Sequence, residues 1–494
     1  MGGFVARVAV VGSGYVGTVV ASCFAWIGHD VIGVEADRSK LEVLRAGRLP
    51  FHEPGLEDLL VAGLRSGHLR FTDDYYDALS RVDAVFLCVG TPSAPDGSAD
   101  MGAMEAAARA VGGAVNGPVV IVTKSTIPIG GAHRVLAAVQ ESLRQCNGDR
   151  PSVRLVHNPE FLREGSAVSD FFRPDRLVIG SDDAEALRSL TRLYRPILDQ
   201  SFPGGDPSHT PGFLATDLIT AETVKYASNA FLATKISFIN ELANICDLVG
   251  ADIDDVAVGM GLDHRISPGF LRAGLGWGGS CFGKDLSALV ATARRLGHDP
   301  HLLSATMLVN QRQRAGVVQR LNTILGSLRG RRVGLLGLAF KPGTDDVRDA
   351  PGLDLAVRLL DLGTTVTAYD PVVSSVSLPG LTVAADPYEV GSGADAIVLV
   401  TEWPEFLLLD LASLRRRMRG DVLLDGRNLF DGAQAALAGF RYLAIGRPSK
   451  SLLERVVTLD EEVVDVDVDG AARPENGDWS LEVAADSVDG VAVP

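Results

Sequence analysis

The stretch VARVAVVGSGYVG, residues 5–17, decides the fold that we expect for this chain. Its first seven residues form a near-continuous apolar run, which is typical of a strand buried on both faces of a sheet. The glycines Gly12, Gly14 and Gly17 follow at once in the spacing Gly-x-Gly-x-x-Gly, and a helix-like stretch continues to Gly28. These residues predict a strand, a tight turn and a helix whose N-terminus a ligand can approach closely.

A second predicted strand, residues 31–34, ends in Glu35, which lies 18 residues after Gly17. Strand, glycine turn, helix, strand and acid together form the dinucleotide-binding fingerprint in its required context. The Glu35 carboxylate would accept from both ribose hydroxyls and repel a 2′-phosphate. We therefore expect NAD rather than NADP as the cofactor. Its expected ligands in the fingerprint are Gly12, Gly14, Tyr15, Val16, Gly17 and Glu35.

Two more predicted strands, 83–89 and 119–122, run into polar turns that contain Thr91, Ser125 and Thr126. Functional groups of doubly wound sheets lie just past the carboxyl ends of the strands. We therefore expect these three side chains to border the cofactor cleft. A helix cap or turn former is an equally good interpretation of Ser125.

The predicted strand 153–156 is followed by two carboxylates, Glu160 and Glu164, which flank an apolar pair. Acid–base catalysis needs such groups near a cleft, with pKa values set by burial. A solvated loop with one capping acid is the alternative. Residues 202–212 are rich in proline and glycine and predict a connection.

Residues 215–248 contain no proline or glycine and predict one long helix. Glu222, Lys225 and Asn229 fall on one face of it, at spacings of three and four residues. The small and apolar neighbours of Lys225 could place its amine in a cleft, although most helix lysines are solvated. A helix of this length at a domain junction also suits a dimer interface.

Residues 278–285, GGSCFGKD, place Cys281 directly before a helix-like segment, 286–296. A helix N-terminus and the Lys284 cation would both favour the reactive thiolate. A buried cysteine in a flexible loop is the alternative interpretation. Six glycines within residues 269–283 and the following Lys-Asp pair favour a nucleophile.

Residues 331–446 repeat the strand pattern of the first domain without its glycine fingerprint. Strands are predicted over 333–337, 365–369, 394–400 and 422–424, and the first two lead to Lys341 and Asp370 respectively. We expect a second doubly wound domain that holds a nucleotide-like ligand and is not a second NAD site. Candidate phosphate or carboxylate ligands in this domain are Lys341, Arg348 and Arg427.

These patterns predict an α/β protein with two doubly wound Rossmann-like domains, joined by a long central helix and a helical middle domain. The expected NAD-binding domain covers residues 1–210 and the helical central domain, which carries the Cys281 loop, residues 211–325. The nucleotide-like ligand is assigned to the third domain, 326–450. The remaining residues, 451–494, are expected to be a disordered acidic tail.

The net charge of −16 belongs mostly to that tail. Residues 460–494 hold eleven acidic residues and one arginine, which leaves about −6 for the rest of the chain. No basic patch suggests nucleic-acid binding, and no apolar run reaches the length of a membrane span. The five cysteines are scattered without a CxxC pair, which argues against a zinc site or a disulfide framework. The N-terminus lacks a signal-peptide pattern, so a cytoplasmic location is expected. No metal site is expected.

The chain resembles the UDP-glucose/GDP-mannose dehydrogenase family over residues 5–446. The resemblance rests on the motifs GSGYVG (12–17), CVGTP (88–92), KSTIP (124–128), NPEFLREG (158–165), KYASNAF (225–231), GWGGSCFGKD (276–285), AFKPGTDDVRD (339–349) and DGRN (425–428). The GGSCFGKD version is closer to the UDP-glucose 6-dehydrogenase branch than to the GDP-mannose branch. Branches that act on N-acetylmannosamine sugars tend to depart from GGSC.

The resemblance implies roles for individual residues. The implied catalytic residues are Cys281, Lys225, Asn229, Asp285, Glu160 and Thr126. The implied NAD contacts outside the fingerprint are Lys40, Thr91, Thr126, Glu164, Lys284 and Arg348. The implied substrate contacts are Glu160, Phe161, Leu162, Arg163, Glu164, Lys225, Asn229, Arg265, Phe270, Leu271, Gly274, Trp277, Gly278, Phe340, Lys341 and Arg427. In the family the arginine at position 265 reaches across from a second subunit, so a homodimer or larger homo-oligomer is implied.

One NAD site and one thiol can oxidise a primary alcohol to an acid through a thiohemiacetal and a thioester on Cys281. UDP-glucose is the expected substrate, with TDP-glucose or GDP-mannose as alternatives. A two-electron hydroxyacid-type dehydrogenase would need neither Cys281 nor the third domain. An NAD-sensing or scaffold protein would have no turnover, although the intact catalytic residues argue against it. The sequence leaves the nucleotide base and the sugar epimer open.

Overall fold

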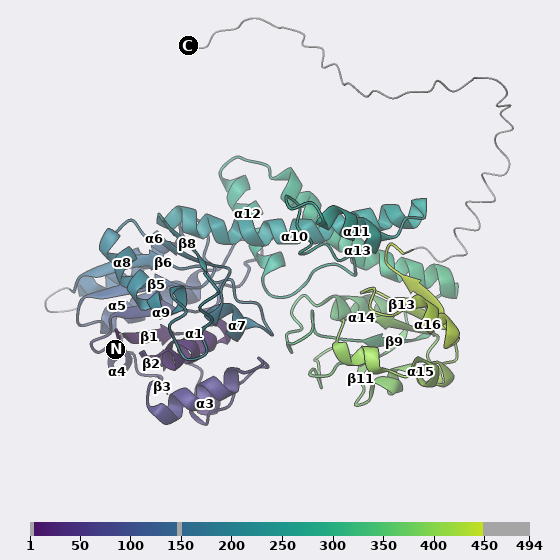
Figure 1. Ribbon diagram of the computed structural model, residues 1–494, viewed down its shortest axis with the longest axis horizontal. Coiled ribbons are helices and arrows are strands. Elements are labelled where there is room, and N and C mark those ends of the chain that lie inside the picture. Colours follow the sequence, from purple (N-terminus) through teal and green to yellow (C-terminus); the bar gives the residue numbers. More distant parts are fainter. Residues whose placement is uncertain (1–3, 146–150, 448–494) are drawn as a thin grey trace, which may run out of the picture. The chain divides into compact units, whose positions relative to one another are not determined.

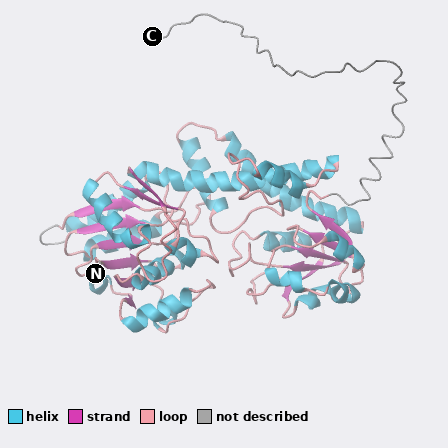
Figure 2. Ribbon diagram, in the orientation of Figure 1, coloured by secondary structure: helices cyan, strands magenta, loops and turns pink. Residues whose placement is uncertain are grey.

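A largely parallel sheet occupies the first part of the chain in the computed structural model, which describes residues 4–145 and 151–447 (Figures 1 and 2). Its strand order is β3-β2-β1-β4-β5-β6-β7-β8. The strands are β1 (Arg7–Val11), β2 (Asp30–Val34), β3 (Leu69–Thr72), β4 (Ala84–Leu87), β5 (Val119–Thr123), β6 (Val153–His157), β7 (Arg176–Gly180) and β8 (Gly212–Thr216). The first six strands in this order, from β3 through β2 and β1 to β6, all pair in parallel. Strand β7 meets β6 in antiparallel at His157 and Gly180, and β8 is parallel to β7.

Helices cover both faces of this sheet and enclose two apolar cores (Figure 2). They are α1 (Tyr15–Trp26), α2 (Arg38–Arg45), α3 (Leu56–Ser66), α4 (Tyr75–Ala78), α5 (Gly102–Ala114), α6 (Gly131–Gln145), α7 (Ala167–Phe172), α8 (Ala184–Leu193) and α9 (Arg195–Leu198). Helix α1 packs on one face with α3 and α7, and α5 pairs with α6 on the other. The central strands carry apolar residues on both faces for this reason.

The long central helix is α10 (Leu218–Val249), the long teal helix of Figure 1. It begins three residues later than predicted, because residues 215 and 216 complete β8 and Asp217 caps the helix by accepting from the Thr220 amide. Helices α11 (Ile253–Gly261), α12 (Phe282–Arg295) and α13 (His301–Leu325) follow. Helix α10 packs against all three, and the glycine-rich loop lies between α11 and α12.

A second parallel sheet follows, with the order β11-β10-β9-β12-β13-β14. Its strands are β9 (Arg332–Leu336), β10 (Thr365–Tyr369), β11 (Leu381–Val383), β12 (Ala396–Leu399), β13 (Val422–Asp425) and β14 (Arg441–Ala444). Its helices are α14 (Pro351–Asp361), α15 (Leu411–Arg417), α16 (Gly432–Leu437) and the 3-10 turns η1 (Pro387–Gly391) and η2 (Pro404–Leu408). This order repeats that of β1 to β6, so the predicted fold class is confirmed.

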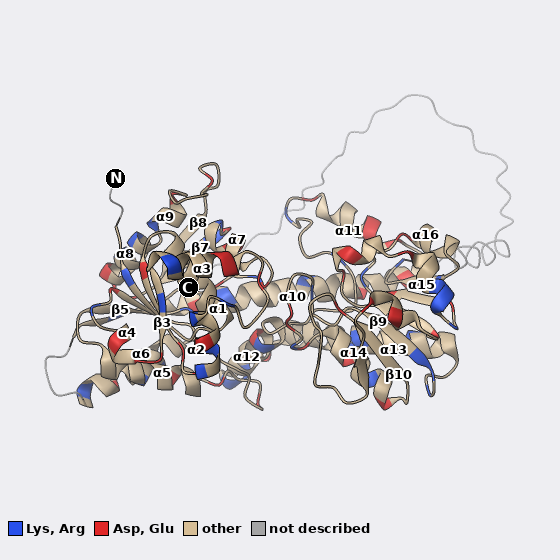
Figure 3. Ribbon diagram, turned by 90° about the horizontal axis from the view of Figure 1, so that it is seen from below, with Lys and Arg blue, Asp and Glu red and all other residues tan. Residues whose placement is uncertain are grey.

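Three further features bear on function. In the part of the chain that the structure describes, no helix is long and apolar enough to span a membrane. Basic and acidic residues are interspersed along the helices, apart from the arginines at the end of α15 (Figure 3). Among the same residues no group of three His, Cys, Asp or Glu side chains is placed to hold a metal ion. The predicted tail, 451–494, and Cys146 lie outside the described residues.

Candidate active site

The glycine fingerprint forms the turn between β1 and α1. Gly12 adopts a φ of +90°, and a Cβ atom there would lie 3.0 Å from the Cys88 carbonyl. A Cβ atom on Gly17 would lie 1.9 Å from the Gly12 carbonyl oxygen. At Gly14 nothing lies within 4 Å of a Cβ position, so this glycine faces open space. Two glycines therefore serve packing, and the third leaves room for a pyrophosphate at the helix N-terminus.

Glu35 lies directly after β2, as the fingerprint requires. One of its carboxylate oxygens accepts from the Ser13 amide at 3.1 Å and the other from the Asp37 amide at 2.9 Å. A carboxylate has about four acceptor positions, so capacity for ribose hydroxyls remains. Lys40 is exposed in the first turn of α2, and the side chains of Tyr15 and Val16 are half-buried. These residues fit a bound NAD.

The polar residues that follow β4 and β5 tie the two turns together. The Thr91 hydroxyl donates to the Thr126 carbonyl at 2.6 Å. The Ser125 hydroxyl donates to the Val89 carbonyl at 2.7 Å, so Ser125 is a turn former here. Thr126 keeps a partly exposed side chain at the carboxyl end of the sheet.

Glu160 and Lys225 form a buried ion pair, with Nζ 2.8 Å from Oε1. Burial alone would raise the pKa of Glu160, but the Lys225 ammonium overrides it and the pKa is lowered. Burial would likewise lower the pKa of Lys225, yet Glu160, Cys281 and Asp285 raise it. Both groups are therefore ionised. Lys225 is a buried cation in contact with one of the two predicted acids, and not the solvated lysine that was the alternative.

A second buried group joins α10 to α12. The Asn229 amide donates to Asp285 Oδ2 at 2.6 Å, and Lys284 Nζ donates to Asp285 Oδ1 at 2.7 Å. Asp285 is 1 % exposed. The long helix thus presents Lys225 and Asn229 on one face, while Glu222 of the same face binds the Gly130 and Ala132 amides at the start of α6.

Cys281 is the residue that precedes the first turn of α12. It keeps accessible surface, although protein atoms surround it on most sides. This enclosure raises the pKa of the thiol, and the opposing cation is Lys225. The prediction that Lys284 would favour the thiolate was therefore wrong for this structure, because Lys284 is bound to Asp285 and burial outweighs the favourable charge. The Ser280 hydroxyl lies 3.6 Å from Cys281 Sγ.

Residues 158–165, which carry Glu160 and Glu164, form a loop after β6 that we call the acid loop. Glu164 connects this loop to the Cys281 loop and to the third domain. Its carboxylate accepts from the Thr344 hydroxyl at 3.0 Å and from Ser280 at 3.4 Å, and it lies 3.5 Å from Arg348. Burial and the neighbouring Asp346 carboxylate raise the pKa of Glu164 to about 7. The predicted residues Glu164 and Arg348 are thus brought together beside the cysteine loop.

The loop before Cys281 is held by packing. The Leu271 and Trp277 side chains are buried, and Trp277 Nε1 donates to Ser237 at 3.0 Å. A Cβ atom would lie 2.9 Å from the Gly426 carbonyl at Gly274 and 2.3 Å from the Asp349 carbonyl at Gly278. These predicted substrate contacts therefore shape the loop.

Two other predicted contacts of this loop are solvent-facing. Arg265 is exposed and pairs with Asp263 at 2.6 Å. Phe270 is 38 % exposed, with a φ of +63°. Neither side chain is part of the buried cluster around Lys225.

Three further predicted substrate contacts, Phe340, Lys341 and Arg427, belong to the third domain. Phe340 lies under Gly279, where a Cβ atom would come 2.7 Å from its ring. Lys341 is partly exposed, and burial lowers its pKa. Arg427 Nε donates to the Val400 carbonyl at 2.7 Å and faces Glu402 at 3.2 Å.

On the acid loop, the predicted contacts Phe161, Leu162 and Arg163 all have partners within the protein. The Arg176 guanidinium covers the Phe161 ring at 3.9 Å, and Lys225 Nζ lies 5.5 Å from the same ring. Arg163 is exposed and pairs with Asp170 at 2.5 Å. The Leu162 amide donates to Glu160 at 2.8 Å and so fixes that carboxylate.

Sequence reasoning missed a buried polar network below Glu160. Lys124 Nζ donates to Asn158 at 2.9 Å, and the Tyr194 hydroxyl donates to the same Asn158 oxygen at 2.8 Å. Burial lowers the pKa of Lys124 to about 8. Lys124 and Asn158 belong to the quoted motifs, but no sequence signal marks a lysine as buried. Glu53, which the Tyr15 hydroxyl contacts, carried no signal either.

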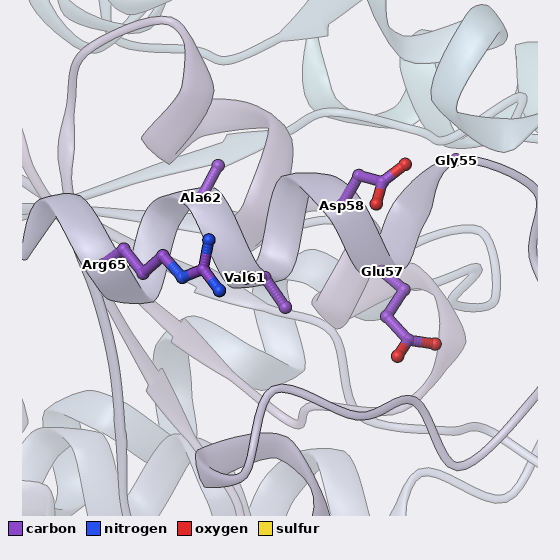
Figure 4. A pocket seen from close by; sticks show the side chains of 6 residues that line it. All are labelled: Gly55, Glu57, Asp58, Val61, Ala62 and Arg65. Atoms are coloured by element: carbon purple, nitrogen blue, oxygen red, sulfur yellow. The ribbon is translucent and has the colours of Figure 1, made fainter.

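A cavity of about 860 Å³ adjoins the cysteine loop. Gly279, Ser280 and Lys284 line it together with Ser93, which follows Thr91, and with Arg348. A hollow of about 490 Å³ lies elsewhere, along the outer face of α3 (Figure 4). Its polar lining comes from Glu57, Asp58 and Arg65, and it contains none of the predicted site residues, so the first cavity is the relevant one.

Comparisons with known proteins cover most of the chain. Residues 6–198, 219–312 and 334–432 match, respectively, the NAD binding, central and UDP binding domains of the UDP-glucose/GDP-mannose dehydrogenase family. A UDP-glucose 6-dehydrogenase of Rhizobium meliloti is 43% identical over 449 residues, which cover 90% of this chain and 100% of that protein. One from Pseudomonas aeruginosa is 44% identical over 452 residues, covering 90% and 98%.

The solved structure of a UDP-glucose dehydrogenase from Pyrobaculum islandicum superposes with a TM-score of 0.81. Its sequence is 40% identical, and the match covers 90% of this chain and 98% of that one.

Proposed function

Because the chain belongs to the UDP-glucose/GDP-mannose dehydrogenase family, we propose that it oxidises the C6 alcohol of UDP-glucose to a carboxylate. Membership makes the chain an NAD-dependent nucleotide-sugar dehydrogenase, and this confirms the predicted cofactor and enzyme class. UDP-glucose is proposed because relatives more than 40% identical carry its name. Glu35, Gly14 and the cavity beside Ser93 supply a fitting place for NAD.

The observation that carries the proposal is the position of Cys281. It lies before α12, near enough for Lys225, Glu160 and Asp285 to act on its thiol. A two-electron dehydrogenase has no use for a thiol enclosed among a lysine and two acids. A four-electron oxidation needs one, because the aldehyde formed first must be held until the second oxidation.

Bound NAD accepts one hydride in each of the two oxidations. In the first, the C6 alcohol loses a proton and a hydride and becomes an aldehyde. Lys225 is a buried cation and Asn229 a fixed amide donor, so both would stabilise negative charge on the sugar oxygen. Lys225 stays protonated because its pKa is raised, so it acts as a hydrogen-bond donor and the proton of the alcohol is released to water.

Cys281 then adds to the aldehyde. The new bond joins Sγ to C6, the thiol proton is released, and the oxygen is protonated to give a thiohemiacetal. The second oxidation removes the C6 hydrogen as a hydride and the hydroxyl proton, which leaves a thioester on Cys281. The raised pKa of the thiol means that Lys225 must offset burial when the thiolate forms.

Water then cleaves the thioester and restores the thiol. Glu160 is ionised and buried, and the Leu162 amide fixes its orientation, so it can take the proton of the attacking water. Asp285, held by Asn229 and Lys284, faces the same thiol and would assist. One alcohol, two NAD⁺ and one water thus give one carboxylate, two NADH and three protons.

The other assignments are part of the same proposal. NAD would contact the fingerprint, Thr91, Lys284 and Arg348, with Thr126 and Glu164 between cofactor and sugar. The acid loop, the loop 265–278, Phe340, Lys341 and Arg427 would hold the sugar nucleotide. The thiol must stay free, as the described cysteines are, so we assign the protein to the reducing cytoplasm.

We also propose that the chain is a homodimer built on α10. Phe231, Phe238 and Ile245 recur every seven residues on this helix and are 65 %, 46 % and 48 % exposed, and Leu248 is 83 % exposed. An exposed apolar stripe of this kind fits a second copy of the same helix. Arg265 is exposed, so it could leave its ion pair with Asp263 of its own chain and enter the partner's site. Light scattering that found an active monomer would contradict both points.

The experiment that tests the function is a count of NADH. Purified protein is given a limiting amount of UDP-glucose with excess NAD, and NADH and the sugar products are measured. Two NADH per sugar, with the carboxylate as product and little free aldehyde, are expected. One NADH per sugar would favour a two-electron dehydrogenase, and turnover only with TDP-glucose or GDP-mannose would change the substrate.

A further inference from the structure

Glu53 lies three residues before α3 and is 4 % exposed. Its Oε2 accepts from the Tyr15 hydroxyl and from the Gly165 amide at 2.6 Å, and its Oε1 accepts from the Ala167 amide at 2.8 Å. The mechanism above gives Glu53 no role. A buried carboxylate is costly to keep, so its partners indicate what it does.

The partners of Glu53 belong to the two halves of the site. Tyr15 is the first residue of α1, within the cofactor fingerprint, and its ring lies 5.0 Å from that of Phe51. Gly165 directly follows Glu164 on the acid loop, and Ala167 is the first residue of α7, where this loop ends. One carboxylate therefore joins the turn that receives NAD to the loop that carries Glu160 and Glu164.

The same segment also reaches the third domain. The His52 amide donates to Asp345 at 3.1 Å. Gly165 adopts a φ of +79°, and a Cβ atom there would lie 2.7 Å from the Gly343 carbonyl. The backbone that Glu53 holds is thus the backbone that meets residues 343–345, beside Lys341.

We propose that Glu53 is a positioning residue that couples the cofactor turn to the acid loop, so that both are in place when hydride leaves the sugar. The inference rests on the proposed function. A carboxylate offers about four acceptor positions, so Glu53 can bind a hydroxyl and two amides at once. Burial and Glu53 raise the pKa of Tyr15, which keeps this hydroxyl a donor.

A carboxylate just before a helix can instead cap that helix, and Asp74 is an example in the same domain. Asp74 accepts from the Tyr76 and Asp77 amides at 2.8 and 3.3 Å and so caps α4. Its partners lie within three residues of it. The partners of Glu53 lie 38, 112 and 114 residues away. Asp74 therefore provides a matched control in the same domain.

The test uses the full-length protein and four variants: Tyr15→Phe, Glu53→Gln, the double variant and Asp74→Ala. Initial rates are measured against NAD and against UDP-glucose, and melting temperatures are recorded. Tyr15→Phe is nearly isosteric and removes one hydroxyl, so it should raise the KM for NAD about tenfold with little change in the KM for UDP-glucose. Glu53→Gln should raise both KM values and lower kcat by about tenfold or more.

The double variant should be no worse than Glu53→Gln, because the Tyr15 hydroxyl acts through Glu53. Asp74→Ala should lower the melting temperature and leave kcat and both KM values unchanged. The proposal is overturned if Glu53→Gln behaves like Asp74→Ala, or if the losses of the two single variants add. Wild-type protein that makes no NADH from any nucleotide sugar would instead refute the proposed function.

Discussion

The two sheets share one strand order but differ at the acid that follows the second strand. In the first sheet this acid is Glu35, which accepts from the Ser13 and Asp37 amides. In the second it is Asp370. Five donors among the described residues bind its carboxylate: the Leu338, Ala339, Val372 and Val373 amides and the Trp403 indole, at 2.7 to 3.1 Å.

The turns that precede these acids differ in the room that they leave for a ligand. Gly14 of the first turn faces open space. In the second turn Gly337 has a φ of +105° and abuts Thr401, and the next residues, Leu338 and Ala339, are fully buried. A carboxylate offers about four acceptor positions, so Asp370 has none left for a ribose. The repeated topology therefore supplies a scaffold twice, and a dinucleotide site once.

The largest expected effect concerns a group that neither sheet supplies. Cys281→Ala should abolish formation of the carboxylate, with a loss of about 10³-fold or more, because no thiohemiacetal can form for the second oxidation. Binding of NAD should be unchanged, since the turn at Gly14 is untouched. The assay is NADH stoichiometry with product identification, and NAD binding by calorimetry.

Cys281→Ser is a less severe companion variant, because a serine oxygen could form an ester slowly and mass spectrometry would detect the adduct. If Cys281→Ala still made two NADH per sugar at a near-normal rate, Cys281 would be a structural residue.

Asp370→Ala should destabilise the protein strongly. It leaves several buried amides and the Trp403 indole without an acceptor, which should lower the free energy of unfolding by about 3 kcal/mol or more. Chemical denaturation measures the loss. The ratio of kcat/KM for NAD over NADP should stay at the wild-type value, because Asp370 does not face the cofactor.

Glu35→Ala should have the opposite profile. Preference for NAD over NADP should fall by about tenfold or more, because the carboxylate that repels a 2′-phosphate is gone. Stability should fall less than in Asp370→Ala, since two amides rather than five donors lose their acceptor. Equal kcat/KM values for NAD and NADP in the wild type would contradict the role of Glu35.

Much of this comparison could be predicted from the sequence. The buried central strands carry apolar runs, so β1, β2, β4 to β6, β9, β10, β12 and β13 were all expected, as was α10. The strands β3, β7, β8, β11 and β14 were missed. Strand β8 shows why: it has five residues, of which Gly212 was assigned to the connection 202–212 and Ala215 and Thr216 to the long helix.

The residues of the candidate site also fall into those that the sequence marks and those that it does not. Cys281, Lys225 and Asn229 could be singled out because glycines and helical spacing mark them, whereas the role of Asp285 was implied only by the family resemblance. The charge state of Cys281 was not predicted correctly, since it depends on which cation remains free, and Lys284 is taken by Asp285. Glu53 and Lys124 were missed because their partners come from distant parts of the sequence.

The smallest effect concerns Glu164, the acid through which the first domain meets residues 344–348 of the third. Burial and Asp346 raise its pKa to about 7, from an ordinary value of 4.5. Between these pH values the folded protein holds a proton that the unfolded chain has released. Stability contributed by Glu164 is therefore present below pH 4.5, falls as the pH rises to 7, and is constant above it.

Asp346, which lies beside Glu164, and the buried His157 elsewhere in the first domain could obscure this slope, and both contributions are separable. Burial would raise the pKa of Asp346, but Arg348 overrides it and the pKa is lowered, so Asp346 stays ionised through the window. Burial lowers the pKa of His157 to about 3, which gives a slope of opposite sign below its ordinary value of 6.5. Both groups remain in Glu164→Gln. Subtracting the two denaturation profiles should therefore leave a decline of at most about 1.4 kcal/mol per pH unit. A flat difference between pH 4.5 and 7 would mean that Glu164 is ionised throughout and that its contacts with Ser280 and Thr344 are those of a carboxylate.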